Sequence, residues 1–257
     1  MDLGLRDKVI VVTGGTRGIG EGILRVLSDE KVIVCNISRD EDDNLELKKS
    51  LSEAGIHFVK VESADPGSCE SAVRSVVQAF GRIDGLVNNA ADNEHGGMET
   101  SDYDKFLHSL HSNLLPGYLM THFALPYLKE SRGTIVNIST MGAETLQGDT
   151  SFGGAVPGGQ NALTREWAVE LLKYGIRVNS VTVLASRMIP FESPPQGALE
   201  NPGKNPDEYH YPLPFENLLT TPFEIAHAVA FLLSEKSSHT TGQLFRVNGG
   251  SRTLTGS

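Results

Sequence analysis

The sequence predicts a doubly wound α/β fold, in which about seven parallel strands form one sheet with helices on both faces. Short apolar runs alternate with longer amphipathic stretches throughout the 257 residues, and strands separated by helices of about ten or more residues form βαβ units. Three runs, at Val9–Val12, Val32–Val34 and Ile135–Ile138, are almost wholly apolar. Such runs are typical of strands that are covered on both faces.

Each element is assigned from its apolar period and its boundary residues. The expected strands are Lys8–Thr13, Lys31–Asn36, His57–Ser63, Gly85–Asn89, Gly133–Ser139, Arg177–Thr182 and Gln243–Val247. The expected helices are Gly18–Ser28, Asp43–Ala54, Pro66–Phe80, a long region Ser101–Ser131 that divides into two helices near Asn113–Pro116, Ala162–Tyr174 and Pro222–Ser234. No linker or repeat divides residues 1–257, so one domain is expected. The long proline-rich stretch Phe191–Asn217 is expected to be a loop that closes over a site.

Composition narrows the class of protein. The net charge is −10, from 22 basic and 32 acidic residues, which argues against nucleic acid or an acidic membrane as partner. The two cysteines, Cys35 and Cys69, form no metal-ligand motif, and no Cys/His cluster indicates a metal site. The start of the chain has no signal-peptide pattern, and no apolar run of ~18 residues follows. A cytoplasmic protein is expected.

A glycine-rich loop joins the first strand to the first helix. It is Thr13–Gly20, and the residues expected to contact a ligand are Gly14, Thr16, Arg17, Gly18, Ile19 and Gly20. Glycines allow the backbone to approach a pyrophosphate, and the helix N-terminus offers free N–H groups and a positive dipole end. The position of the loop, at a strand–helix junction, favours a dinucleotide site; the alternative is a glycine-rich turn that binds nothing.

With this spacing the sequence resembles the short-chain dehydrogenase/reductase family, whose loop motif is T-G-x-x-x-G-x-G. Further matches cover the whole chain: Asn88-Asn89-Ala90, Asn113, Ile135–Ser139, Arg177-Val178-Asn179, Thr241-Gly242-Gln243 and Gly249-Gly250. Phe80–Asn89 and Leu163–Ala168 are most similar to sugar dehydrogenases of the L-fucose dehydrogenase type. The resemblance implies a Rossmann-type sheet and an NAD or NADP cofactor near the loop and Asn89. It also implies a homodimer or homotetramer joined through helices that include Leu114–Glu130 and Ala162–Leu172.

The second expected strand ends at Asn36, where NAD-preferring members of the family have Asp bonded to the ribose hydroxyls. Asn carries no charge to repel a 2′-phosphate, and Arg17 and Arg39 could bind one. NADP is therefore modestly favoured over NAD. The alternative is that both arginines are solvated surface charges.

The resemblance also implies a catalytic set of Asn, Ser, Tyr and Lys, and this chain departs from it. Asn113 is kept, Thr140 stands at the Ser position, Gly153 at the Tyr position and Pro157 at the Lys position. No Tyr lies between Tyr127 and Tyr174, and no Lys between Lys129 and Lys173, so no shift of the alignment restores the pair. Because glycine and proline disfavour helix interiors, the helix is expected to begin at or after Pro157.

Other cofactor contacts of the family are changed as well. The nicotinamide-contacting Pro-Gly is Val183-Leu184 and the carboxamide-binding Thr is Met188, while the adenine-contacting Asp is Glu62, followed by Ser63. The pyrophosphate end of the implied site is therefore intact, the adenine end altered and the nicotinamide end lost. Any dinucleotide is expected to bind weakly or to play a structural role.

Replacement chemistry would need polar groups on loops at the carboxyl ends of strands. The best candidates are His95, Glu144 and Arg187, because a His with a carboxylate offers acid–base chemistry near neutral pH and Arg can stabilise an anion. We expect a small-molecule pocket lined by these residues with Thr140 and Gly153. The alternative for each candidate is a surface residue.

Three functions remain open. The first is an enzyme that catalyses isomerisation, elimination or cyclisation of a small metabolite without net hydride transfer. The second is a catalytically inactive, dinucleotide-binding scaffold subunit. The third is an atypical NADPH-dependent reductase in which Thr140 polarises a carbonyl and a water or a His supplies the proton.

Overall fold

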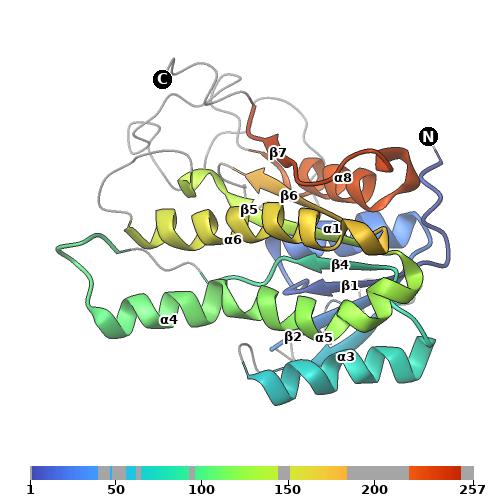
Figure 1. The fold of residues 1–257 in the computed structure, drawn as a ribbon, viewed down its shortest axis with the longest axis horizontal. Coiled ribbons are helices and arrows are strands. Elements are labelled where there is room, and N and C mark those ends of the chain that lie inside the picture. The colour runs from blue at the N-terminus through green and yellow to red at the C-terminus, as the bar shows by residue number, and fades with distance from the viewer. Residues whose placement is uncertain are drawn as a thin grey trace.

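The structure, a computed structural model, has a central sheet of seven parallel strands between two layers of helices (Figure 1). It describes residues 2–39, 47, 56–61, 65–92, 96–143, 151–183 and 220–249. The strand order is β3-β2-β1-β4-β5-β6-β7, and every neighbouring pair is parallel. The predicted doubly wound fold is confirmed.

The strands are short and mostly buried. They are β1 (Val9–Thr13), β2 (Ile33–Ser38), β3 (His57–Lys60), β4 (Gly85–Asn88), β5 (Thr134–Thr140), β6 (Arg177–Val183) and β7 (Leu244–Val247). Alternate residues of one strand serve both faces of the sheet, because side chains alternate along a strand. In β1, Ile10 and Val12 pack in one apolar cluster, and Val9 and Val11 pack in the other.

The helices form one layer on each face. The helices are α1 (Gly18–Asp29), α3 (Pro66–Phe80), α4 (Tyr103–Asn113), α5 (Leu115–Ser131), α6 (Ser151–Glu170) and α8 (Pro222–Leu233), with short 3-10 helices η1 (Met141–Ala143), η2 (Leu172–Tyr174) and η4 (Glu235–Ser237). Helices α1 and α8 contribute to the cluster that contains Ile10, whereas α3, α5 and α6 contribute to the cluster that contains Val9. Figure 1 shows α3, α4, α5 and α6 together on one side of the sheet.

Most predicted elements are confirmed to within two or three residues. The long region after β4 divides as predicted, since α4 ends at Asn113 and α5 begins at Leu115. The predicted end of the second strand at Asn36 is wrong, because β2 continues to Ser38 and pairs there with β3. The predicted helix Asp43–Ala54, apart from Leu47, and the loop Phe191–Asn217 lie outside the described residues.

The predicted start of the helix at or after Pro157 is also wrong. Helix α6 begins at Ser151 and contains Pro157. Phe152 and Val156 are only 3% and 6% exposed, so their burial against the rest of the fold outweighs the poor helix propensity of the neighbouring glycines. At its other end α6 finishes at Glu170, and the last predicted residues form η2.

Candidate functional site

The glycine-rich loop lies where the strand order reverses. The chain passes from β1 to β2 on one side and later to β4 on the other, so β1 lies between them. In open α/β sheets, ligands bind in the crevice at the carboxyl ends of the strands at such a switch point. The Gly14–Gly20 loop is therefore placed at the expected edge of the sheet.

Two glycines of the loop are needed for its shape. Gly14 has φ of 67°, and a Cβ there would lie 2.8 Å from the Cα of Ala90. A Cβ at Gly20 would lie 2.8 Å from the Asn89 Nδ2. The positive φ at Gly14 is strained for residues with a side chain. Because an added Cβ would clash at either position, the loop and the segment after β4 approach as closely as glycine allows.

Hydrogen bonds to the segment directly after β4 fix the loop. The Asn89 Nδ2 donates to the carbonyls of Thr13, at 3.0 Å, and of Gly14, at 2.9 Å. The Thr13 Oγ1 accepts from the backbone N–H groups of Asn89 and Ala90 at 2.9 and 3.0 Å. Asn89 therefore stabilises the conformation of the loop through its backbone carbonyls. The organising role of the Thr13 hydroxyl was not predicted, since a sequence does not show that β4 ends beside β1.

Asn36 is fully buried and points at the loop. Its Oδ1 accepts a hydrogen bond from the backbone N–H of Gly15 at 2.9 Å. This hydrogen bond ties the Asn36 side chain, on β2, to the backbone of the loop and so stabilises the turn.

The start of α1 presents polar groups to the crevice. Arg17 is the N-cap residue, with an extended backbone and no capping hydrogen bond from its side chain. Arg17 is exposed, while Thr16, Gly18 and Ile19 are half-buried. The first N–H groups of a helix need external acceptors and carry a positive partial charge, so this end of α1 fits an anionic group.

Arg39 forms a bidentate ion pair with Asp92 across the site. Its Nη2 lies 2.6 Å from the Asp92 Oδ1 and its Nη1 3.2 Å from the Asp92 Oδ2. The pairing of Asp92 with Arg39 was not predicted from the sequence. The two residues lie 53 positions apart, so no local sequence signal links them.

Thr140 and Asn113, two of the residues predicted to be catalytic, lie in different surroundings. Thr140 is exposed at the carboxyl end of β5. Asn113 is half-buried at the end of α4, where its Oδ1 accepts from the backbone N–H of Asp92 at 2.6 Å and its Nδ2 donates to the carbonyl of Ser109 at 3.1 Å. Asn113 therefore ties the segment after β4 to α4.

Gly153 and Pro157, which the resemblance placed at the Tyr and Lys positions of the family, both lie within helix α6. The Phe152 ring packs 5.4 Å from the ring of Phe106, and the Phe152 N–H donates to the carbonyl of Gly96 at 3.3 Å. These contacts fix the register of the helix. Phe152 was not predicted as a site residue.

Polar bonds hold the same helix on the sheet. The Asn137 Nδ2 donates to the Thr164 Oγ1 at 2.8 Å, and the Asn137 Oδ1 accepts from the Asn88 Nδ2 at 2.9 Å. All three side chains are buried. Buried polar groups that bond one another fix one arrangement, so α6 is positioned by contacts to β4 and β5.

The Tyr and Lys residues that flank this helix in sequence lie near the amino-terminal ends of β5 and β6. The Nζ of Lys129 lies 4.2 Å from the ring centroid of Tyr174, and that of Lys173 lies 5.1 Å from it. Tyr174 precedes β6, and Lys129 precedes β5. The seven residues of β5 separate this end of the strands from Thr140 by roughly 20 Å, so all of these side chains lie far from Thr140.

Several predicted residues fall outside the described part of the chain. They are His95, Glu144, Arg187, Glu62, Ser63, Leu184 and Met188. Their roles stay predictions, and so does the pocket that His95, Glu144 and Arg187 were expected to line with Thr140 and Gly153. Within the described ranges, no group of His, Cys, Asp and Glu is arranged to hold a metal ion, and no helix is long and apolar enough to span a membrane.

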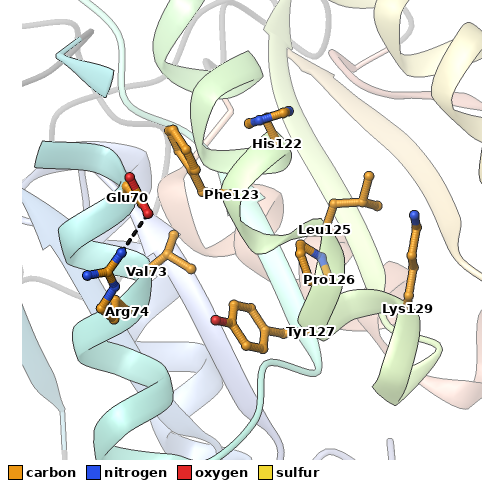
Figure 2. Close-up of a pocket in the computed structure, with 9 residues that line it drawn as sticks. All are labelled: Glu70, Val73, Arg74, His122, Phe123, Leu125, Pro126, Tyr127 and Lys129. Carbon is orange, nitrogen blue, oxygen red and sulfur yellow. Dashed lines mark hydrogen bonds and ion pairs between the residues drawn. The ribbon is translucent and has the colours of Figure 1, made fainter. Parts of the chain in front are cut away.

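A pocket of about 360 Å³ lies on the outer surface of α3 and α5 (Figure 2). Its lining combines apolar side chains such as Val73 and Phe123 with the charged groups of Arg74 and Lys129. Arg74 is paired with Glu70 at 2.6 Å. None of the residues predicted for the cofactor or for catalysis lines this pocket.

Comparisons with known proteins agree with this architecture. A family model described as enoyl-(acyl carrier protein) reductase matches residues 14–252. An uncharacterized oxidoreductase of Thermotoga maritima is 33% identical over 253 residues, covering 96% of both chains. The L-fucose dehydrogenase of Rattus norvegicus is 30% identical over 243 residues, covering 94% of this chain and 88% of the relative.

A 3-oxoacyl-[acyl-carrier-protein] reductase of Thermotoga maritima is 31% identical, covering 96% of this chain and 98% of the relative. The crystal structure of Cj0485 dehydrogenase superposes with a TM-score of 0.86 at 33% identity, over 98% of this chain and 96% of that one. These relatives are dehydrogenases and reductases. From the fold, the loop and these matches together, the chain belongs to the short-chain dehydrogenase/reductase family.

Proposed function

We propose that this protein binds NAD or NADP at the Gly14–Gly20 loop and converts a small metabolite without net hydride transfer, by isomerisation, elimination or cyclisation. One observation carries the proposal: α6 is kept in place, but it offers Gly153 and Pro157 where the family has its Tyr and Lys. Neither residue has a titratable side chain. The family's proton transfer needs such a group tuned near the working pH.

The nucleotide half of the site supports dinucleotide binding. When bound, a nicotinamide dinucleotide supplies the hydride in the family's redox reactions. In this chain the N–H groups at the start of α1 would bind the pyrophosphate, and Thr13 and Asn89 would hold the loop in shape. Affinity is expected to be weak, because the Lys that holds the nicotinamide ribose in the family is replaced by Pro157.

The chemistry is proposed to lie at the carboxyl ends of β4, β5 and β6. Thr140 offers an exposed hydroxyl that can polarise a carbonyl. His95, Glu144 and Arg187 follow these strands in the sequence, and they would supply acid, base and anion stabilisation. Residues 191–217 would close the pocket over a small metabolite.

Calorimetry and a turnover assay test the proposal. Titration with NAD and NADP should give weak binding, and assays with L-fucose, other sugars, alcohols and ketones should give negligible change at the nicotinamide absorbance. The double variant Gly153→Tyr with Pro157→Lys should not restore oxidation of L-fucose, because Val183 and the changed residues after it still leave the nicotinamide unsupported. Turnover by the wild type at rates usual for the family would contradict the proposal.

The second candidate function is a homodimeric or homotetrameric scaffold. Three exposed apolar side chains on α5, α6 and η2 favour it: Tyr118 is 46% exposed, Val169 77% and Leu172 60%. Helices α5 and α6 both contribute to the apolar cluster that contains Val9, so they cover the same face of the sheet. A contiguous exposed apolar patch marks an association surface, and we propose that these three side chains belong to one. The variant Val169→Lys with Leu172→Lys should lower the mass measured by light scattering, and a folded wild-type monomer would refute the oligomer.

An atypical reductase is distinguished by Thr140. If the chain reduces a carbonyl with NADPH, Thr140→Val should abolish the turnover while leaving the fold intact. Activity that persists in Thr140→Val would assign the polarising role to another group.

A further inference from the structure

The ion pair between Arg39 and Asp92 crosses the nucleotide site. Arg39 follows β2 and Asp92 follows β4, and these strands lie on opposite sides of β1. Neighbouring strands are ~4.8 Å apart, so the two chain segments are separated by about 10 Å at the sheet. The paired side chains span this distance above the carboxyl end of β1. The Gly14–Gly20 loop begins at that same end.

A hydrogen bond to Asn113 fixes the backbone of Asp92. Its backbone N–H donates to the Asn113 Oδ1 at 2.6 Å, and Asn113 is bonded in turn to the carbonyl of Ser109 at 3.1 Å. The Asp92 side chain is 33% exposed and that of Arg39 is 50% exposed. The carboxylate is therefore presented by a fixed backbone, and a ligand can still reach the pair from solvent.

The chemistry of the pair matches that of a phosphorylated ribose. A guanidinium binds a carboxylate or a phosphate with the same two parallel N–H···O bonds. In dinucleotide-binding folds, the end of the second strand lies beside the adenosine ribose, and an Arg there accommodates the 2′-phosphate of NADP. Asp92 now accepts hydrogen bonds from Nη1 and Nη2 of Arg39 with its two oxygens, which is the pair of parallel bonds that a phosphate would make.

We propose that Asp92 is a specificity-determining residue, which competes with a ribose 2′-phosphate for Arg39 and so reduces any preference for NADP over NAD. This inference rests on the proposed function, because it requires that a dinucleotide binds at the Gly14–Gly20 loop. The negative charge that the family places near the end of β2 is absent, because Asn36 stands at that position. Asp92 supplies a negative charge from the opposite side, at the end of β4.

Two effects of Asp92 act in the same direction. Its carboxylate must leave Arg39 before a phosphate can bind there, and its charge repels a 2′-phosphate nearby. A ribose with a free 2′-hydroxyl meets neither effect. Removal of the charge should therefore improve binding of the phosphorylated ribose and leave the unphosphorylated one unchanged.

Calorimetry with two fragments of the cofactor provides the test: 2′,5′-ADP, which carries the 2′-phosphate, and 5′-AMP, which does not. Asp92→Asn keeps the shape of the side chain and removes its charge. It should tighten binding of 2′,5′-ADP by about two- to fivefold, the range expected for an exposed ion pair, and leave 5′-AMP unchanged. Adding Arg39→Met should abolish the gain. The matched control is Glu70→Gln, which removes one charge from another Arg–carboxylate pair and should change neither affinity.

Each outcome has a distinct meaning. Unchanged or weaker binding of 2′,5′-ADP by Asp92→Asn would overturn the inference alone, provided that both fragments bind the wild type. Weaker binding of 5′-AMP by Asp92→Asn would also overturn it, because Asp92 would then be a ligand of the ribose. If neither fragment, nor NAD or NADP, binds any variant, the proposed function fails and the inference fails with it.

Discussion

Alanine in place of Gly154 and Gly158 should stabilise the protein. Both residues lie inside α6. A Cβ at position 154 would have the carbonyl oxygen of Gly142 as its nearest neighbour, at 3.7 Å, and a Cβ at position 158 would meet no heavy atom within 4 Å. Neither glycine is therefore required by packing. A glycine inside a helix costs about 0.5–1 kcal/mol relative to alanine.

The two substitutions together should raise the free energy of unfolding by about 1–2 kcal/mol. For a domain of this size, 1 kcal/mol corresponds to roughly 2–4 °C in Tm, so circular dichroism should show a gain of about 2–8 °C. Amide hydrogen exchange should also slow in residues 151–160.

Gly20→Ala is the matched control, because it adds the same methyl group to another helix. There the Cβ would lie 2.8 Å from the Asn89 Nδ2, and the variant should be destabilised. A loss of stability in the Gly154→Ala, Gly158→Ala variant would refute the reasoning. It would mean that this part of α6 is not the helix described, or that a close contact forbids the added methyl groups.

Three further predictions concern stability and reactivity. Arg177→Ala should lower the free energy of unfolding by about 3 kcal/mol or more in urea titrations, because the guanidinium bonds buried carbonyls at the end of α8; a loss under 1 kcal/mol would contradict this. Cys35 should resist thiol reagents until the protein unfolds, since burial raises its pKa to about 12. Asp65→Ala should lower Tm at neutral pH, because the N–H of Ser68 bonds the carboxylate and lowers its pKa. The contribution is present above about pH 4 and lost as the pH falls through the lowered pKa, so the two Tm curves should converge in acid.

Local signals explain the elements that were predicted well. Helix α3 was predicted with its observed bounds, because both its ends carry strong markers. Asp65 caps the first turn, Pro66 fits the first helical position, and Gly81 ends the helix with a φ of 75°. The parallel sheet followed from the period of apolar residues, which a single sequence displays directly.

The site was predicted less well, because its contacts join residues far apart in the chain. The glycine-rich loop was located from its motif, yet its support by Asn89 comes from 76 positions away. Asn36 was predicted to belong to the cofactor site, but its hydrogen bond from the Gly15 N–H was not predicted. The pairing of Arg39 with Asp92 has no sequence signal, since it depends on β2 and β4 lying on either side of β1.

The wrong prediction for the start of α6 shows that tertiary contacts can hold a helix whose own sequence disfavours it. Glycine and proline lower the helix propensity of residues 153–159, and on that basis the helix was expected to begin later. Burial of Phe152 and the bond between Asn137 and Thr164 hold the helix regardless. These contacts come from residues other than Gly153 and Pro157, so the helix does not depend on a particular side chain at either position. Under the proposed function, the helix keeps its place beside the ligand while the family's titratable groups are absent from it. For this reason we favour a retained binding site with changed chemistry over a collapsed one.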